Sequence, residues 1–312
     1  MNELLQTLTS NEDTRLPAWH RVGLNVQGAR TSADVLQKAF MTWNVAQAPV
    51  QWMDMNGTLH IDDTYKCNFR DDNCRLLGIV GRDYTIVQNS DAFAFVDHLI
   101  GEGVQYERVG SLRGGARIWL LAKLPEHNIL HDVFSPYLLI TNGHDGRTSI
   151  NVAVTPVRMA CWNTLNLALQ QAQQRWSFSH TLNVKSRLSL AQQTLTLART
   201  YMAQLEARSE KLATMALSIS DEEAYIKRLF PEKKSETANR NNEERIARFR
   251  NCYAVPDLDN VRGTAYGFLM AVSDYTSHKT METQKQRESH FLRTVVQPAG
   301  LLELASSFFA AA

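Results

Sequence analysis

The stretch YLLITNGHDGRTSINVAV (residues 137–154) predicts two β-strands joined by a tight turn. Residues 137–141 and 148–154 are rich in apolar and β-branched side chains, which favour strands. Between them lies the hexapeptide Asn-Gly-His-Asp-Gly-Arg of residues 142–147. Asn-Gly and Asp-Gly are strong turn signals because these residues tolerate a positive φ. We therefore expect an antiparallel hairpin here.

The sequence before this hairpin continues the strand pattern. Residues 106–109 and 116–124 bracket a glycine-rich turn at residues 110–115, which predicts another pair of strands. Shorter strands are expected at residues 43–45, 58–61, 65–69, 76–80 and 84–87. The last two of these flank a Gly-Arg-Asp turn and are expected to pair as a hairpin.

Helix signals interrupt the strands. Thr31 is expected to cap a short helix, because its hydroxyl satisfies free N–H groups and Asp34 suits the helix dipole. A second helix is expected over residues 89–100, which two glycines terminate. Residues 157–169 predict the start of a third helix.

The composition changes near residue 185, where a long helix is expected. Apolar residues recur at heptad spacing in two series: Leu188, Leu195 and Met202, and Ala191, Ala198, Leu205 and Leu212. This spacing is typical of an a/d seam. Two alternatives stay open: the seam packs within the chain, or it joins two copies of the chain.

The remaining third of the chain predicts further helices. A capping box at Ser220 predicts a helix that Pro231 ends. Residues 231–244 predict a polar linker, with helices to follow at residues 243–253 and 261–277 and an apolar tail at 301–312. The fold class is therefore expected to be α+β. An antiparallel sheet with packed helices would occupy residues 1–180, and a helical region residues 181–312.

Composition and charge limit the function classes. The chain has 312 residues, a hydrophobic content of 44% and a net charge of +1. It can therefore bury a substantial core, and a nucleic-acid site would have to be a local basic patch. Neither a signal peptide nor a membrane-length apolar run is present in the sequence, so we expect a cytoplasmic protein with no membrane partner.

Common catalytic motifs are missing from the sequence. It contains no phosphate-binding P-loop, no Gly-x-Gly-x-x-Gly, no His-Glu-x-x-His and no Gly-x-Ser-x-Gly. No cofactor and no metal are expected. Cys67 and Cys74 flank a polar turn and face each other across the expected hairpin, but no His cluster completes a ligand set.

The hexapeptide of residues 142–147 is the first candidate site. A His beside an Asp serves as a general base or a metal ligand in many sites, which is one reading of His144 and Asp145. A tight turn stabilised by Asn142 and Asp145 is another reading. In a third, the loop contacts nucleic-acid backbone, with Arg147 holding a phosphate.

The second candidate lies around Arg158 and Asn163, at the expected strand-to-helix junction. Arginine and a helix N-terminus bind anions well, so these residues are candidates for a phosphate or base contact. The alternative is that Arg158 anchors the junction through a buried ion pair.

The third candidate combines Arg113, Gly114, Gly115 and Arg117 with Trp119 on the following strand. Glycines let a backbone approach a ligand, and arginine beside an aromatic ring is common on single-strand-binding sheets. The alternative is a glycine-rich turn with solvated arginines. A basic stretch at residues 227–250 is either a solvated face or a phosphate-contacting arm.

Several of these pieces occur together in one known family. In chain order they are Pro17 to His20, Trp43 to Val45, Leu77 to Asn89, Gly110 to Gly115, Asn142 to Gly146 and Arg158 to Leu165. In order and spacing the chain resembles the phage/plasmid-like protein family, whose shared domain has no assigned function. The resemblance covers about half of the chain. It implies a mobile-element gene product in a bacterial cytoplasm and brings no catalytic residues.

The function expected from these features is non-catalytic binding of nucleic acid in phage or plasmid DNA metabolism. Single-strand annealing or recombination is the expected role, with single-stranded DNA as the partner and a homo-oligomer as the assembly. The coarse element order loosely looks like that of single-strand annealing recombinases, which use a curved antiparallel sheet and a helix. One alternative is an interaction protein that blocks a host defence system by binding. Another is an enzyme that uses His144 and Asp145.

Overall fold

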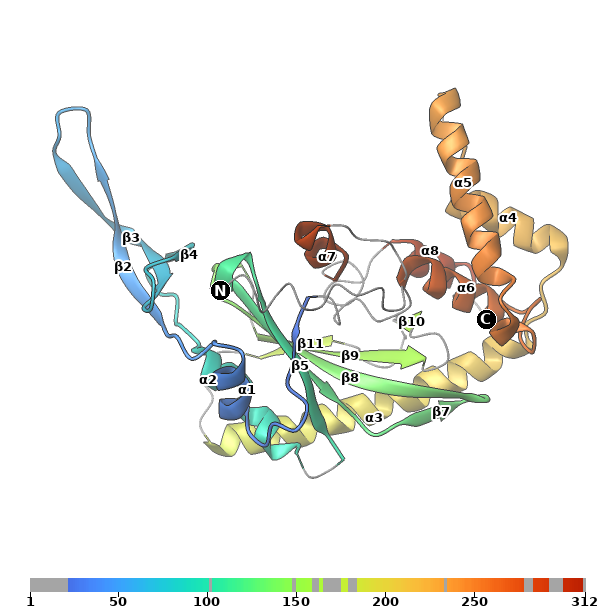
Figure 1. Ribbon diagram of the computed structural model, residues 1–312, viewed down its shortest axis with the longest axis horizontal. Coiled ribbons are helices and arrows are strands. Elements are labelled where there is room, and N and C mark those ends of the chain that lie inside the picture. Colours follow the sequence, from blue (N-terminus) through green and yellow to red (C-terminus); the bar gives the residue numbers. More distant parts are fainter. Residues whose placement is uncertain are drawn as a thin grey trace.

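The structure is a computed structural model. It describes residues 22–100, 103–147, 150–158, 163–164, 175–178, 184–232, 235–277, 283–291 and 300–310. Antiparallel sheets occupy the first half of the chain and helices the second half, so the fold class is α+β, as the sequence predicted. Figure 1 shows the central sheet between a projecting β-arm and a cluster of helices.

The central sheet is antiparallel throughout. Its strand order is β1-β5-β6-β8-β9-β10, with β7 paired to β8 and β11 paired to β9. The strands are β1 (Leu24–Asn25), β5 (Gln105–Leu112), β6 (Arg117–Lys123), β7 (His127–Ile129), β8 (Asp132–Gly143), β9 (Ile150–Arg158), β10 (Asn163–Thr164) and β11 (Arg175–Phe178). The two hairpins predicted around residues 110–115 and 142–147 are therefore confirmed.

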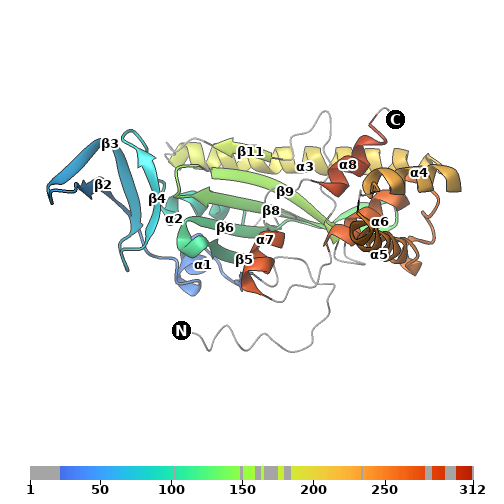
Figure 2. The same ribbon diagram turned by 90° about the horizontal axis from the view of Figure 1, so that it is seen from above.

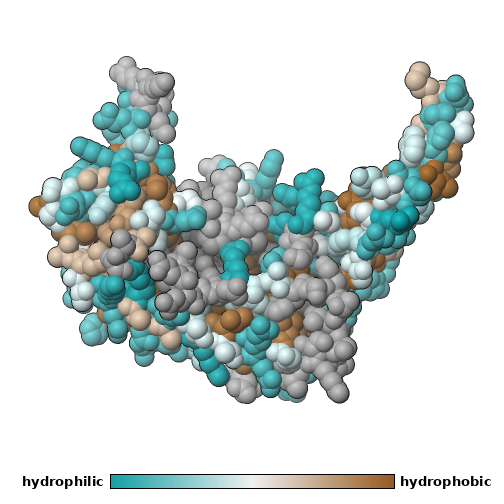
Figure 3. Space-filling model, turned by 180° about the vertical axis from the view of Figure 1, so that it is seen from behind, coloured by the Kyte–Doolittle hydropathy of each residue, from teal (hydrophilic) through white to brown (hydrophobic). Residues whose placement is uncertain are grey.

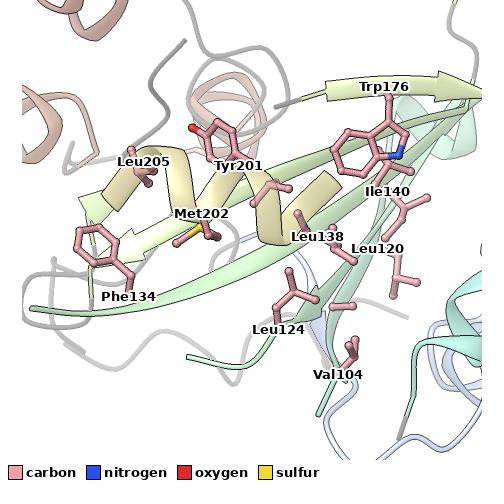
Figure 4. Packing of buried hydrophobic residues seen from close by; sticks show 14 of the residues in the cluster. Val104, Leu120, Leu124, Phe134, Leu138, Ile140, Trp176, Tyr201, Met202 and Leu205 are labelled. Atoms are coloured by element: carbon pink, nitrogen blue, oxygen red, sulfur yellow. The ribbon is translucent and has the colours of Figure 1, made fainter. Parts of the chain in front are cut away.

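The long helix α3 (Val184–Thr214) covers one face of this sheet. Ala198, Tyr201, Met202 and Leu205 are buried in one hydrophobic cluster with sheet residues such as Leu138. Figure 4 shows Tyr201, Met202 and Leu205 on the helix, with Leu138 and Phe134 on the strands next to it. The heptad seam thus packs within the chain, and its alanines let the helix approach the sheet closely.

The opposite face of the sheet is apolar as well. Trp119, Leu121, Tyr137 and Leu139 form a second cluster there with Phe291, which lies at the end of α7 (Gln284–Phe291). The ring centroids of Trp119 and Phe291 are 4.5 Å apart. Burial on both faces explains why β6 and β8 read as nearly continuous apolar runs instead of alternating.

A second, three-stranded sheet projects from the molecule (Figures 1 and 2). Its order is β2-β3-β4, with β2 at Val45–Met53, β3 at Leu59–Arg70 and β4 at Leu76–Gly81. We call this sheet the arm. Two helical segments lie at its base: α1 (Ser32–Lys38), and α2 (Asn89–Phe93) with its 3-10 continuation η2 (Ala94–His98). Thr31 and Asp34 form the predicted cap of α1 as a full capping box.

The helices after α3 gather at the other end of the sheet. They are α4 (Ile219–Leu229), α5 (Glu236–Tyr253), the 3-10 turn η4 (Pro256–Leu258), α6 (Ala265–Ser277) and α8 (Leu301–Ser307). Helix α6 is buried nearly all round, and its Phe268 ring packs against Phe249 of α5 at a centroid distance of 5.4 Å and an interplanar angle of 60°. The domain boundary expected at residue 180 falls just before α3, which shares its core with the sheet.

The structure corrects several predicted elements. Residues 84–87 do not form a strand, because residues 84–88 cross over the turn that follows β8. Strand β4 pairs with β3 instead. The helix expected at residues 157–169 does not begin at Val157. Val157 and Arg158 continue β9 opposite β8, residues 163–164 form β10, and the rest of that range lies outside the described residues.

Two corrections concern the helical end. The capping box of α4 is made by Ser218 with Asp221, two residues before the expected Ser220. The linker expected at residues 231–244 is shorter, because α5 already begins at Glu236. The predicted α4 helix is thus confirmed with a cap shifted by two residues, whereas polar residues predicted as a linker form the first turns of α5.

The α4 capping box makes stability depend on pH. The Ser218 hydroxyl, at 2.6 Å from the Asp221 carboxylate, and the Ser218 backbone N–H, at 3.0 Å, lower the pKa of Asp221 below 3.8. The stabilisation that the ionised Asp221 carboxylate provides is therefore complete above pH 3.8. It is lost as the pH falls through the lowered pKa of Asp221 in the folded protein. We expect Asp221→Ala to lower the Tm at pH 7, and this deficit to shrink as the pH falls below 3.8.

Thermal unfolding followed by circular dichroism at pH 7 and at a series of pH values below 3.8 tests this expectation. Glu210→Ala, on the exposed side of α3, is the matched control. An equal Tm deficit of Asp221→Ala at all of these pH values would contradict the assignment of the ionised carboxylate as the stabilising group.

Candidate nucleic-acid interface

The base of the arm meets the central sheet at three closely packed segments. They are β4, the residues 113–116 that link β5 to β6, and the turn 144–147 that follows β8. A Cβ added to Gly78 would lie 2.6 Å from the Cα of Asp145, and one added to Gly146 would lie 2.8 Å from Val80. Only glycine permits backbones to approach this closely. We call this region the junction.

Buried polar groups connect the segments of the junction. The His144 ring Nε2 lies 2.9 Å from Asn89 Oδ1, and the His144 carbonyl accepts from Asn68 Nδ2 at 2.8 Å. The Asn142 amide donates to the Val87 carbonyl at 3.1 Å. His144, Asn142, Asn68 and Asn89 are all buried. Buried polar groups that are hydrogen-bonded fix one arrangement, so this network sets the position of the arm against the sheet.

The network also fixes the tautomer of His144. Asn89 Nδ2 donates to the carbonyls of Met41 and Trp43, at 2.9 and 3.2 Å. Asn89 Oδ1 is therefore the acceptor toward His144, and Nε2 of the ring carries the proton. The ring is fully buried with its edge toward Trp43, at a centroid distance of 5.7 Å. A general base must reach its substrate, so this burial favours the tight-turn reading of the hexapeptide over a catalytic one.

Arginines surround the network on its solvent side. Arg75, Arg113 and Arg147 are exposed and form no ion pair with another described residue. Arg117 lies 4.0 Å from Asp145, with both side chains largely buried. We call these four arginines the rim. The side chain of Arg75 lies over Gly114, where an added Cβ would come within 2.1 Å of the guanidinium carbon.

The rim follows β4 from end to end. Arg113 stands next to Gly114 at the start of β4, and Arg147 next to Gly146 at its end. At a rise of about 3.3 Å per residue, β4 spans roughly 20 Å. A surface of this length is able to contact several phosphates of an extended strand.

Two of the acids near the rim are paired with arginines. Asp72 is held by Arg70, whose Nη2 lies 2.6 Å away, and Asp145 lies 4.0 Å from Arg117. The Arg70 guanidinium also stacks over Trp43, 4.4 Å from the ring centroid. Asp71 accepts from the Asn44 backbone N–H at 2.8 Å and keeps its negative charge, because this donor is neutral. Tyr84 donates to the Gly143 carbonyl at 3.1 Å, and burial together with Asp145 raises its pKa.

Arg158 occupies a different place, at the far end of β9. Its guanidinium holds Asp132 at 2.7 and 2.9 Å and Asp257 at 2.8 Å, and its side chain is 3% exposed. Asp132 begins β8, whereas Asp257 lies in η4, so this cation joins the sheet to the helical end. Because β9 continues through Arg158, the helix that the sequence predicted from Val157 does not begin there.

The structure thus divides the predicted site residues into three groups. The junction brings together Arg113, Gly114, Gly115, Arg117, Asn142, His144 and Arg147. Trp119 lies inside the sheet, where it packs on Phe291 and is fully buried among the described residues. Arg158 and Asn163, whose backbones pair between β9 and β10, lie at the opposite end of the sheet.

Arg75 was missed by the sequence analysis. It follows the polar turn between β3 and β4, and nothing in its local sequence distinguishes it from a solvated loop arginine. Its contact with Gly114 arises from the packing of the arm on the sheet. The signal was indirect: Gly114 and Gly115 indicated a close approach, but not which segment approaches.

The described residues contain no cluster of His, Cys, Asp or Glu that would hold a metal ion. Cys67 and Cys74 are free thiols, and the Cys67 Sγ lies 3.3 Å from the Ala48 carbonyl oxygen. Burial raises the pKa of the Cys252 thiol to about 12, so it is not a nucleophile at neutral pH. Among the described helices none is both long and apolar enough to cross a bilayer.

Fold and junction define an α+β protein with a two-faced antiparallel sheet, a covering helix and an arginine rim. The chain belongs to the family described as Domain of unknown function (DUF932), whose model matches residues 76–296. This match extends into the helical half, where the sequence pattern alone was generic. Neither the curated proteins nor the solved structures give a match.

The ion pairs of Arg158 lead to a stability prediction. Removing a buried cation leaves its carboxylates uncompensated, so Arg158→Met is expected to lower the free energy of unfolding by about 3 kcal/mol. This is the lower end of the usual range, because Asp132 and Asp257 are partly exposed. The exposed Arg147→Met is expected to change it by less than about 0.5 kcal/mol. Urea unfolding measures both values, and equal values would contradict the structural role of Arg158.

Proposed function

We propose that this protein binds single-stranded nucleic acid along the rim, without catalysing a reaction on it. The observation that carries the proposal is the gathering of three exposed arginines, Arg75, Arg113 and Arg147, around β4, beside the paired Arg117 and Asp145. The resemblance seen in the sequence supports a role in phage or plasmid DNA metabolism, in the cytoplasm of a bacterial host.

The chemistry of the rim suits phosphate. Arginine presents a planar array of donors that matches phosphate oxygens. An exposed guanidinium that forms no ion pair breaks no such contact when it binds a phosphate. Gly114 and Gly146 both have positive φ, at +70° and +75°, and their lack of a side chain makes room for the Arg75 guanidinium and for Val80 to pack against them. With a net charge of +1, attraction comes from this patch and not from the whole molecule.

The architecture supports single-strand annealing as the role. Single-strand annealing recombinases combine a curved antiparallel sheet with a helix and need no nucleotide cofactor. Here α3 runs along the antiparallel strands β5, β6, β8 and β9. The likeness is one of element order only, so it supports the role by analogy.

Fluorescence anisotropy with a labelled oligothymidylate across a salt series tests binding. Arg113→Ala/Arg147→Ala is expected to weaken the affinity about tenfold at low salt. Because about 0.7 counterions are released per neutralised phosphate, the slope of log K against log salt should fall by about 1.4. Lys211→Ala, exposed near the end of α3, is the matched control and should leave both quantities unchanged.

The same samples decide between this proposal and the alternatives. Absence of binding at about 50 mM salt by the folded parent protein would overturn the nucleic-acid proposal. The function as an interaction protein that blocks a host defence system would then stand in its place. Annealing of complementary strands, measured by energy transfer, tests the finer role, and loss of annealing in the double variant is the expected result.

A further inference from the structure

The outer part of the arm is a two-stranded hairpin. Strand β4 pairs only with residues 65–69 of β3, so residues 50–63 extend beyond it with β2 and β3 alone. We call this part the tip. Figures 1 and 2 show it projecting away from the central sheet. Isolated two-stranded hairpins are only marginally stable in water, so pairing with a further strand would stabilise the tip.

The tip exposes large apolar side chains on both of its faces. The exposed fractions are 50% for Trp52, 67% for Met53, 104% for Met55, 57% for Leu59 and 62% for Ile61. Figure 3 shows hydrophobic atoms on the projecting arm. Taking roughly 200 Å² for a fully exposed large side chain, the five expose on the order of 700 Å². The largest apolar patch of a monomeric protein is usually about 300–600 Å², so this one is large enough to mark an interface.

The outer edge of β2 at the tip is open for pairing. The Asp54 N–H donates to the Thr58 carbonyl at 3.0 Å, so this pair is hydrogen-bonded across the hairpin. Hydrogen-bonded and non-hydrogen-bonded pairs alternate in antiparallel strands, which directs the N–H and C=O groups of Trp52 toward β3. Those of Gln51 and Met53 therefore point outward, away from β3.

Residues 50–53 lack one usual protection against pairing. Exposed edges are often blocked by charged side chains, by Pro or by bulges. β2 carries no charged side chain from Val45 to Met53, and its Pro49 and the register shift between Pro49 and Gln51 lie at the inner end of this segment. Pro49 has no N–H and is a natural end for a paired segment. The open edge is thus confined to residues 50–53.

We infer that the tips of two copies of this chain pair through β2, antiparallel and about a two-fold axis at Trp52. In that arrangement Gln51 of one copy is hydrogen-bonded opposite Met53 of the other, and the two Trp52 side chains face each other. The result is a continuous four-stranded tip sheet. This inference goes beyond the proposed function and does not depend on it.

Charge favours a second copy over nucleic acid or an anionic membrane. No Lys or Arg occurs from residue 39 to residue 65, whereas Asp54, Asp62 and Asp63 lie at the tip. Polyanions would be repelled by these carboxylates. In the two-fold pairing, Asp54 of each copy lies beside Val50 of the other, at opposite ends of the paired segment. Like charges are thereby kept apart.

The pairing area is confined to the edge strand. Trp52 and Met53 lie on β2 next to the partner strand, whereas Leu59 and Ile61 lie on β3. The interface is therefore smaller than the about 800 Å² per side of a standard complex, and a weak dimer is expected. A two-fold axis makes the surface complementary to itself, so one exposed edge is sufficient.

Sedimentation equilibrium of the full chain tests the inference. The parent protein is expected to approach twice its 35.3 kDa mass at about 50 µM, a concentration at which weak dimers form. Gln51→Pro removes an outward-pointing N–H and leaves the bonds between β2 and β3 intact. It should raise the dimer Kd at least about tenfold. Gln51→Ala is the matched control and should leave the dimer Kd unchanged.

Cysteine cross-linking supplies a second readout. Side chains that face each other across a non-hydrogen-bonded pair have Cβ atoms about 4.5–5.5 Å apart, which is close to disulfide geometry. In a Cys74→Ser background, Trp52→Cys is expected to form a disulfide-linked dimer on mild oxidation, and Met55→Cys is not. A monomeric parent, or equal dimerisation of Gln51→Pro and Gln51→Ala with circular dichroism unchanged, would overturn the inference.

Discussion

The hydrogen bond between His144 and Asn89 is the interaction on which the rest of the junction depends. It joins the turn after β8 to the start of α2, and the Asn89 amide extends the connection to the carbonyls of Met41 and Trp43. Every partner is buried, so breaking one bond leaves several polar groups without water. The arm therefore has one defined position against the sheet, and the arginines of the rim come from three separate segments into one surface.

Local patterns in the sequence predicted most elements, because the forces that select them act over a few residues. The turn residues of 142–147, the cap at Thr31 and the heptad spacing of α3 are examples. The sequence could not predict that His144 and Asn142 are buried, since Asn89 and Val87 lie 55 positions earlier in the chain. Asp257, which pairs with Arg158, lies 99 positions later. Such partners are determined by packing, and no local pattern specifies them.

The rim and the tip illustrate how differently charge is used at the two ends of the arm. At its base, arginines gather around glycines and one carboxylate. At its tip, carboxylates and apolar side chains occur without a single Lys or Arg. A net charge near zero thus conceals two surfaces of opposite character, joined by the strands β2 and β3.

The position of α3 in the chain has a consequence for synthesis on the ribosome. Within the described residues, the strands of the central sheet are complete once β9 and β11 have left the ribosome. The helix that covers one face of this sheet, residues 184–214, is synthesised afterwards. Leu120, Leu138 and Ile140 therefore remain accessible to water while this helix is still inside the exit tunnel. Nascent chains with exposed apolar sheets are substrates for chaperones. This protein should accordingly need such protection until the last turn of α3 has left the ribosome.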